Sequence, residues 1–293
     1  MRPLSAVRST WKRSITVIAT LTVVALAILP GQVGPVSAST ARFARSVRSA
    51  QPAQPTPTIV LEHRAWADGS SWSGVVRRLQ RAGYTVDAPP NPLRGLSGDS
   101  AYLASFLATV AGPIILVGHS YGGAVITNAA TGNPNVKALV YIDAFIPDQG
   151  DTLARLLGAQ PGSCLGGDPT QVFNFVPDPG APAGDVDLYI KPALFPSCFA
   201  NEVSAAKAAV LAAVQRPLAL NATSDPSGAP AWKTIPSWSL IGTDDHVIPP
   251  VEQRIMSQRA GAHITEVRAS HLSPVDRPDA VADIITQAVH ATM

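Results

Sequence analysis

The sequence predicts an α/β protein in which helices cover both faces of a mostly parallel sheet and a long insertion interrupts the pattern. Two observations support this prediction. Short apolar runs alternate with helical segments, and most of these runs are apolar throughout rather than at every second residue. The chain has 293 residues, 46% of them hydrophobic and 14% charged, which is enough apolar material for a core of this size.

The expected elements follow one another in the order that this architecture requires. Strands are expected at residues 58–61, 84–86, 113–117, 136–142, 237–241 and 263–267. Helices, with Gly83 ending the first, are expected at residues 72–81, 99–110, 124–130, 251–260 and 279–290. Ligands bind at the carboxyl ends of the strands in such sheets, so functional residues are expected directly after strands.

The alternation of strands and helices breaks down between residues 147 and 236. This stretch contains proline-rich turns and one alanine-rich helical segment near residues 201–214. We expect a lid or cap insertion that lies over the functional site, because irregular inserts of this length are usually functional. Some of its apolar residues either line an acyl pocket or belong to the core: Val172, Phe173, Phe175, Leu194 and Phe195.

The N-terminus has the pattern of a secretory signal peptide. Residues 2–13 are basic, residues 15–29 form an apolar run, and Val36-Ser37-Ala38 offers small residues for cleavage. We expect a signal peptide over residues 1–38 that is cleaved near Ala38, a flexible linker over 39–57 and one domain over 58–293. The alternative is an uncleaved membrane anchor, although a bilayer span needs about 20 apolar residues.

Export has consequences for the cysteines and for the choice of partners. Cys164 and Cys198 are the only two cysteines, and we expect a disulfide between them outside the cell, with two buried thiols as the alternative. Residues 1–57 hold seven of the 22 basic residues and none of the 20 acidic ones, so the remainder carries a net charge of −5. This charge argues against nucleic-acid binding, and signal cleavage would leave no stable membrane insertion.

The segment Gly118-His119-Ser120-Tyr121-Gly122 is the most informative part of the sequence. It has the pattern Gly-x-Ser-x-Gly, with an apolar strand before it and a helix after it. This is the context of a nucleophile elbow, in which a Cβ at either flanking position would clash. The segment therefore predicts that Ser120 is a catalytic nucleophile.

A serine nucleophile needs a base, and the base needs an acid that orients it. His271 follows the last expected strand, so its loop reaches the same edge of the sheet as Ser120. Asp245 follows the preceding strand and is the preferred acid, with its neighbour Asp244 as the alternative. Asp143 is a third candidate for which a structural role is expected. The order Ser, Asp, His is typical of this type of site.

Together, these motifs resemble the α/β-hydrolase fold over residues 58–293. The resemblance extends to small bacterial esterase-like proteins that are also similar to plant methylesterases and hydroxynitrile lyases. It rests on the elbow, on Gly242-x-x-Asp245 with Ile248-Pro249, on Ser270-His271 and on the segment from Val60 to Trp72. It implies that the backbone amides of Tyr121 and Ala65 form an oxyanion hole. Relatives carry glycine where this chain has Arg64, whose side chain we expect to face solvent, with a cation near the site's mouth as the alternative.

The sequence therefore predicts a secreted serine esterase that cleaves small-molecule carboxylic esters through an acyl-enzyme intermediate. No metal or organic cofactor is expected, because no His/Cys cluster has the spacing of a zinc site. The alternatives within the fold are a hydroxynitrile lyase and a cofactor-free haloperoxidase. Another alternative is a non-catalytic protein that holds an apolar ligand.

Overall fold

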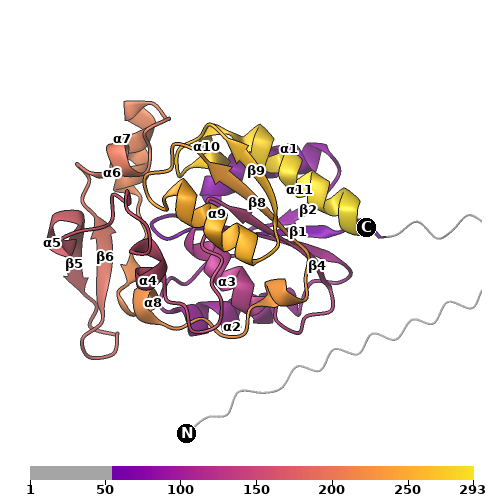
Figure 1. The fold of residues 1–293 in the computed structure, drawn as a ribbon, viewed down its shortest axis with the longest axis horizontal. Coiled ribbons are helices and arrows are strands. Elements are labelled where there is room, and N and C mark those ends of the chain that lie inside the picture. The colour runs from indigo at the N-terminus through magenta and orange to yellow at the C-terminus, as the bar shows by residue number, and fades with distance from the viewer. Residues whose placement is uncertain (1–54) are drawn as a thin grey trace, which may run out of the picture. The chain divides into compact units, whose positions relative to one another are not determined.

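Six parallel strands form the central sheet of the computed structural model, which describes residues 55–293 (Figure 1). Their order across the sheet is β2-β1-β3-β4-β8-β9, and every neighbouring pair is parallel, which confirms the predicted sheet. The strands are β1 (Thr58–Glu62), β2 (Thr85–Asp87), β3 (Ile114–His119), β4 (Val136–Ile142), β8 (Ser237–Gly242) and β9 (His263–Val267).

Helices cover both faces of this sheet because the inner strands are apolar on both sides. In β1, Ile59 and Leu61 belong to the core under α1 and α11, whereas Val60 belongs to the core on the opposite face. The first face carries α1 (Ser73–Arg81) and α11 (Pro278–Thr292), with the short helices η1 (Gly69–Trp72) and α10 (Ser273–Asp276) nearby. The second carries α2 (Leu96–Leu107), α3 (Tyr121–Ala129) and α9 (Pro250–Arg259).

The expected elements outside the insertion are present, with shifts at their ends. The largest shifts are in α2 and α3, which each start three residues earlier than expected. The start of α2 precedes Asp99 because the carboxylate of Asp99 accepts hydrogen bonds from the amides of Arg94 and Gly95, just outside the helix. Gly83 follows Ala82, the C-cap residue of α1, and has φ +90°, as a glycine that ends a helix commonly does.

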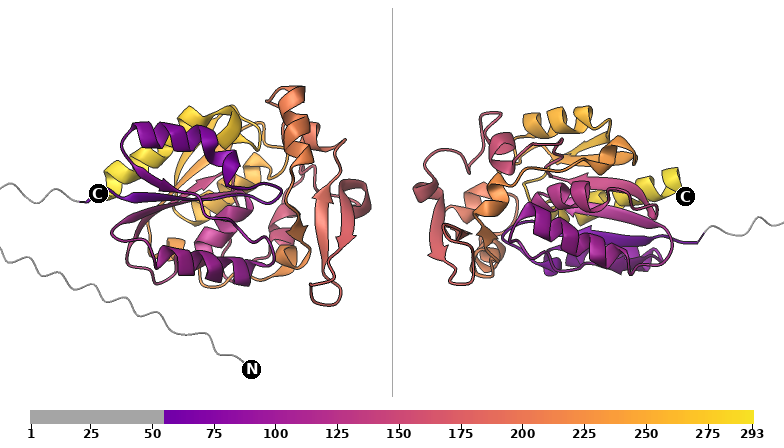
Figure 2. Two further views of the ribbon diagram at one scale, coloured as in Figure 1. Left: turned by 180° about the vertical axis from the view of Figure 1, so that it is seen from behind. Right: turned by 90° about the horizontal axis from the view of Figure 1, so that it is seen from below.

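The insertion is more regular than the sequence analysis expected. It contains a three-stranded antiparallel sheet of β5 (Phe173–Pro177), β6 (Val186–Ile190) and β7 (Leu218–Ala219). Figure 2 shows β5 and β6 beyond the end of the central sheet, with α7 beside them. Its helices are α4 (Leu153–Leu157), α5 (Pro169–Val172), α6 (Phe195–Cys198), α7 (Ala205–Ala213), α8 (Asn221–Ser224) and η2 (Ala231–Lys233). The alternation of Val186, Leu188 and Ile190 with polar residues was the overlooked signal for β6.

The expected signal peptide at 1–38 and most of the expected linker lie outside the described residues. Both stay predictions. Within residues 55–293, no helix combines the length and the apolar character that crossing a bilayer requires.

Cys164 and Cys198 form a disulfide within the insertion, which joins the loop after α4 to the end of α6. The two cysteines are 34 residues apart. Replacing both (Cys164→Ser/Cys198→Ser) should lower the free energy of unfolding by about 2–4 kcal/mol, because the unfolded chain gains freedom when this loop is opened. Urea unfolding followed by circular dichroism measures the change. Wild-type protein in a reducing buffer should lose a similar amount, and an unchanged midpoint in both samples would contradict the prediction.

Candidate active site

Ser120 occupies a strained turn between β3 and α3. Its φ of 54° and ψ of −118° lie where a residue with a side chain is rarely found. The turn is possible because glycines flank it closely. A Cβ on Gly118 would lie 2.5 Å from the carbonyl oxygen of Gly122, and a Cβ on Gly122 would lie 2.5 Å from that of Glu62. The turn places Ser120 at the N-terminus of α3, whose dipole favours negative charge there.

The structure brings Ser120, His271 and Asp245 together in one hydrogen-bonded chain. The Nε2 atom of His271 lies 2.9 Å from the hydroxyl oxygen of Ser120, and its Nδ1 atom lies 2.8 Å from a carboxylate oxygen of Asp245. The carboxylate of Asp245 can only accept a hydrogen bond, so Nδ1 of His271 carries the proton. Nε2 is then free to accept a proton from the serine. The three residues come from loops after β3, β8 and β9, at the carboxyl edge of the sheet, as the sequence analysis expected.

The structure separates the two neighbouring acids that the sequence left open. Asp245 is buried and also accepts hydrogen bonds from the amides of Val247 and Ile248 and from the side chain of Gln253, at 2.7–3.1 Å. Asp244 instead points outward and pairs with Arg268 at 3.3 Å. Of these two acids, only Asp245 contacts His271, because the turn after β8 buries Asp245 and leaves Asp244 partly exposed.

Asp143, the third candidate acid, supports both loops without touching His271. Its carboxyl group accepts from the amide of Gly242 at 2.8 Å and from the amide of Ser273 at 3.2 Å. Burial raises the pKa of Asp143 well above its ordinary value, and the charge of Asp245 raises it further. Burial also raises the pKa of Asp245, but three N–H donors oppose that increase. The arrangement therefore favours the proton on Asp143 and the negative charge on Asp245.

His271 is fully buried, and this favours its neutral form. Burial lowers its pKa well below the ordinary value, and the cation of Arg64 lowers it further. His119 packs beside it and donates from Nε2 to the backbone carbonyl of His271 at 2.8 Å. Both imidazoles are thus arranged as neutral rings, and His119 fixes the loop that carries His271.

Ala65 and Tyr121, whose amides are expected to form the oxyanion hole, line the same cavity as Ser120. The amides of Ala65 and Tyr121 donate no hydrogen bond to another described residue, and both residues line the cavity. The turn that carries Ala65 is held by His63, which donates from Nδ1 to the carbonyl of Arg64 and accepts at Nε2 from the amide of Asn91, both at 2.9 Å. Burial lowers the pKa of His63 to about 4, so this brace stays neutral.

The expectation that Arg64 faces solvent is wrong. Its side chain is 2% exposed, and its Nη1 atom donates to the carbonyls of Ala65 and Trp66 at 2.7 and 3.3 Å. It does not line the cavity that holds Ser120, so the alternative of a cation at the mouth of that cavity is not seen either. The guanidinium packs under its own turn because the rings of Phe195 and Phe199 cover it at 5.8 and 5.3 Å.

The cavity beside Ser120, called here the nucleophile cavity, has a volume of about 200 Å³ and mostly apolar walls. The insertion supplies much of its lining, including Leu153 and Leu157 from α4, Phe173 and Phe175 from β5, and Leu188 from β6. Of the five apolar residues considered from the sequence, only Phe173 and Phe175 line it; Phe195 is buried in the core. The i, i+4 spacing of Leu153 and Leu157 was the signal for the α4 wall.

Trp66, for which no role was predicted, links the insertion to the turn beside Ser120. Its indole N–H donates to the carbonyl of Leu188 in β6 at 2.8 Å. Its ring packs against Phe173 and Phe199, and its φ is 56°. The strained backbone at Trp66 is therefore held by contacts with the insertion.

Comparison with known proteins identifies the class to which this fold and site belong. Residues 59–284 match the alpha/beta hydrolase family, and the chain belongs to that family. The chain is 40% identical over 111 residues to a carbendazim hydrolyzing esterase from Nocardioides sp. (strain SG-4G), a match that covers 33% of this chain. The chain spans about half of that esterase, since the match covers 46% of it.

Two further proteins match over most of their length. The alpha/beta hydrolase nvfD from Aspergillus novofumigatus (strain IBT 16806) is 27% identical over 253 residues, which cover 79% of this chain and 96% of nvfD. The crystal structure of a pyrethroid hydrolase from Sphingobium faniae JZ-2 superposes with a TM-score of 0.64 at 22% identity. It covers 81% of this chain and 98% of that protein, and it shows the same fold.

The close approach at Gly122 yields a test of the turn. A methyl group in Gly122→Ala would meet the carbonyl oxygens of Glu62 and His63 at 2.5 and 3.0 Å. We expect this variant to lose about 1–3 kcal/mol of stability and to displace Ser120. Thermal melting measures the loss.

Gly98→Ala is the matched control, because Gly98 lies in α2 with open space around it. This variant should gain about 0.5–1 kcal/mol, since alanine favours helix. Equal melting temperatures for the two variants would contradict the account of the turn.

Proposed function

We propose that this protein is an exported serine hydrolase that cleaves small, apolar carboxylic esters through an acyl-enzyme intermediate. The observation that carries the proposal is the hydrogen-bonded chain from Ser120 through His271 to Asp245, which opens into a cavity with apolar walls. The names of the relatives, an esterase and two hydrolases, support ester hydrolysis as the class of reaction.

In the first half of the reaction, the hydroxyl oxygen of Ser120 attacks the carbonyl carbon of the ester. His271 takes the serine proton at Nε2, and Asp245 stabilises the imidazolium that forms. When the tetrahedral intermediate collapses, His271 gives this proton to the leaving alcohol and the acyl group stays on Ser120. A water molecule then attacks the acyl group with His271 as its base, which releases the acid and restores the serine.

The amides of Ala65 and Tyr121 are the proposed donors to the oxyanion of the tetrahedral intermediate. Both are free of other partners among the described residues, and both line the cavity with Ser120. One such donor contributes about 2.7–4 kcal/mol of transition-state stabilisation. Because these donors belong to the backbone, their position depends on the turns at Ser120 and at His63, which the glycines and the His63 brace hold.

The insertion acts as a lid in this proposal. Its α4, β5 and β6 supply the apolar wall opposite Ser120, and Trp66 ties it to the turn of Ala65. A wall of leucine and phenylalanine side chains selects for apolar ester groups, and it keeps water from the buried His271. Export is supported by the signal-like pattern of the N-terminus and by the Cys164–Cys198 disulfide, since disulfides persist in oxidising compartments.

Ser120→Ala removes the nucleophile while the fold has room for the smaller side chain. We expect hydrolysis of a chromogenic short-acyl ester to fall at least about 1,000-fold, because no other group can form the acyl-enzyme. Ser105→Ala, on the exposed face of α2, is the matched control and should keep the wild-type rate.

A fluorophosphonate probe tests the nucleophile directly. It should label the wild type and Ser105→Ala but not Ser120→Ala. A wild-type protein that resists the probe would instead identify a non-catalytic protein that holds apolar ligands.

The pH dependence of kcat/KM tests the state of His271. Burial and the Arg64 cation lower its pKa, so the neutral base persists as the pH falls. We expect the acid limb of the profile to lie below the ordinary histidine pKa of about 6.5. Arg64→Gln should move the acid limb to higher pH, because a proton on His271 no longer faces that cation.

Arg81→Gln removes an equal charge from the exposed end of α1 and should leave the acid limb in place. An acid limb at or above pH 6.5 in the wild type would contradict this assignment, and so would a downward shift in Arg64→Gln.

A further inference from the structure

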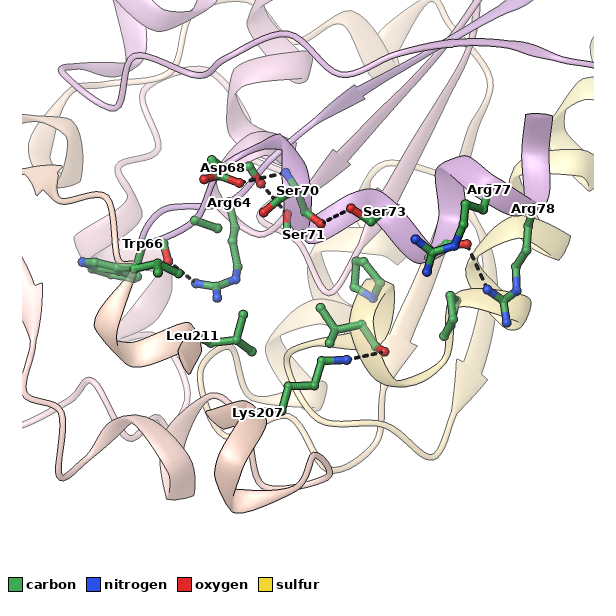
Figure 3. A pocket seen from close by; sticks show the side chains of 16 residues that line it. Arg64, Trp66, Asp68, Ser70, Ser71, Ser73, Arg77, Arg78, Lys207 and Leu211 are labelled. Carbon is green, nitrogen blue, oxygen red and sulfur yellow. Dashed lines mark hydrogen bonds between the residues drawn. The ribbon is translucent and has the colours of Figure 1, made fainter. Parts of the chain in front are cut away.

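A second cavity, called here the Arg64 cavity, lies on the other side of the Arg64–Trp66 turn from Ser120. Its volume is about 420 Å³. One wall is η1 with the start of α1, and the other is α7 of the insertion with α10 (Figure 3). Trp66 lines both cavities, whereas Ser120, His271 and Asp245 do not line this one. The proposed esterase mechanism therefore leaves the Arg64 cavity without a role.

The floor of this cavity is a buried cation without an anionic partner. Arg64 is 2% exposed, and no carboxylate of the described residues pairs with it. Its Nη1 donates to two backbone carbonyls, but Nε has no partner and Nη2 makes no hydrogen bond within the described part of the chain. Figure 3 shows the side chain reaching from the turn toward Leu211 of α7. Buried charges are normally paired, so a guanidinium in this state favours an anion beside it.

Burial does not remove this charge at neutral pH. It lowers the pKa of Arg64 to about 9, which still leaves the guanidinium protonated at pH 7. The two carbonyls that Nη1 contacts and the faces of Phe195 and Phe199 are favourable neighbours for a cation. None of them is an anion, so the positive charge remains available to a ligand.

The polar rim of the Arg64 cavity carries a net positive charge. Arg77 and Lys207 are exposed on opposite walls, and neither pairs with a carboxylate of the described residues. Arg78 also lines the cavity but is neutralised by Asp279. Asp68 is the one carboxylate in the lining; it accepts a hydrogen bond from the amide of Ser70 at 2.8 Å, keeps its negative charge and offsets one of the two exposed cations. The rim therefore attracts anions toward Arg64.

The remaining lining has a polar part, formed by Ser70, Ser71 and Ser73, and an apolar part that suits a ligand with a hydrocarbon group. Leu211 of α7 and Val214, directly after that helix, line this cavity together with Pro274, Val275 and Pro278. A fully hydrated inorganic anion gains nothing from such a wall, whereas an organic carboxylate gains both the charge pairing and the apolar contact. We propose that the Arg64 cavity binds a small organic carboxylate, whose anionic group pairs with Arg64 and whose apolar part packs against α7 and α10.

Isothermal titration calorimetry of the disulfide-bonded protein tests this proposal with benzoate as the probe. Benzamide has the same shape without the charge, and inorganic phosphate has charge without the apolar part. We expect saturable benzoate binding that weakens as salt is added, with benzamide and phosphate each at least about tenfold weaker. The proposal is overturned if benzoate shows no saturable binding up to about 10 mM, or if benzamide or phosphate binds as well as benzoate does.

Variants decide whether the benzoate occupies this cavity or the nucleophile cavity. Arg64→Gln should weaken benzoate binding at least about tenfold, because a buried cation is the main anchor. Arg77→Gln/Lys207→Gln should weaken it at least about threefold, since these charges are exposed and screened. Arg81 lies on α1 outside the lining, so Arg81→Gln should bind benzoate within about twofold of the wild-type affinity.

Arg64→Gln could melt below the assay temperature, and Arg77→Gln/Lys207→Gln then decides the test. Arg77 and Lys207 are exposed and do not belong to the core, so this double variant should stay folded. Wild-type affinity in Arg77→Gln/Lys207→Gln would place the benzoate elsewhere and overturn the proposal.

Discussion

The tight turn at Ser120 is the constraint on which the rest of the site depends. The backbone of β3 must reverse into α3 within one residue, and it does so at a φ that only close packing can maintain. Gly118 and Gly122 allow this because their missing side chains let the elbow approach itself and the end of β1. The same approach brings the Ala65 turn next to Ser120. One steric requirement thus positions both the serine hydroxyl and the two free amides.

Burial of titratable groups is the second determinant of the site, because it keeps most of them in their neutral forms. Asp143 and Asp245 lie in one buried region, and a proton on Asp143 leaves a single negative charge for His271 to face. His63, His119 and His271 all have lowered pKa values because burial disfavours their cations. The region therefore holds one carboxylate and neutral imidazoles, which is the state in which His271 can accept a proton.

The short turn from His63 to Trp66 connects these features to the insertion. Ala65 faces the nucleophile cavity, Arg64 faces the Arg64 cavity, and Trp66 contributes to both. The indole bond to Leu188 and the Phe195–Phe199 rings over Arg64 join this turn to two separate parts of the insertion. The insertion is therefore a wall for both cavities and also a support for the strained backbone between them.

The sequence by itself determined the parallel sheet, the order of its elements and the positions of Ser120 and His271. These features follow from local patterns: apolar runs, helical spacing, and a glycine motif that only one backbone turn requires. Tertiary structure decided between Asp244 and Asp245, because two adjacent aspartates have identical chemistry and differ only in which one the turn after β8 buries. It also decided the direction of Arg64 and the walls of both cavities. Those depend on contacts between segments more than 80 residues apart, such as Trp66 with Leu188, and no local pattern encodes them.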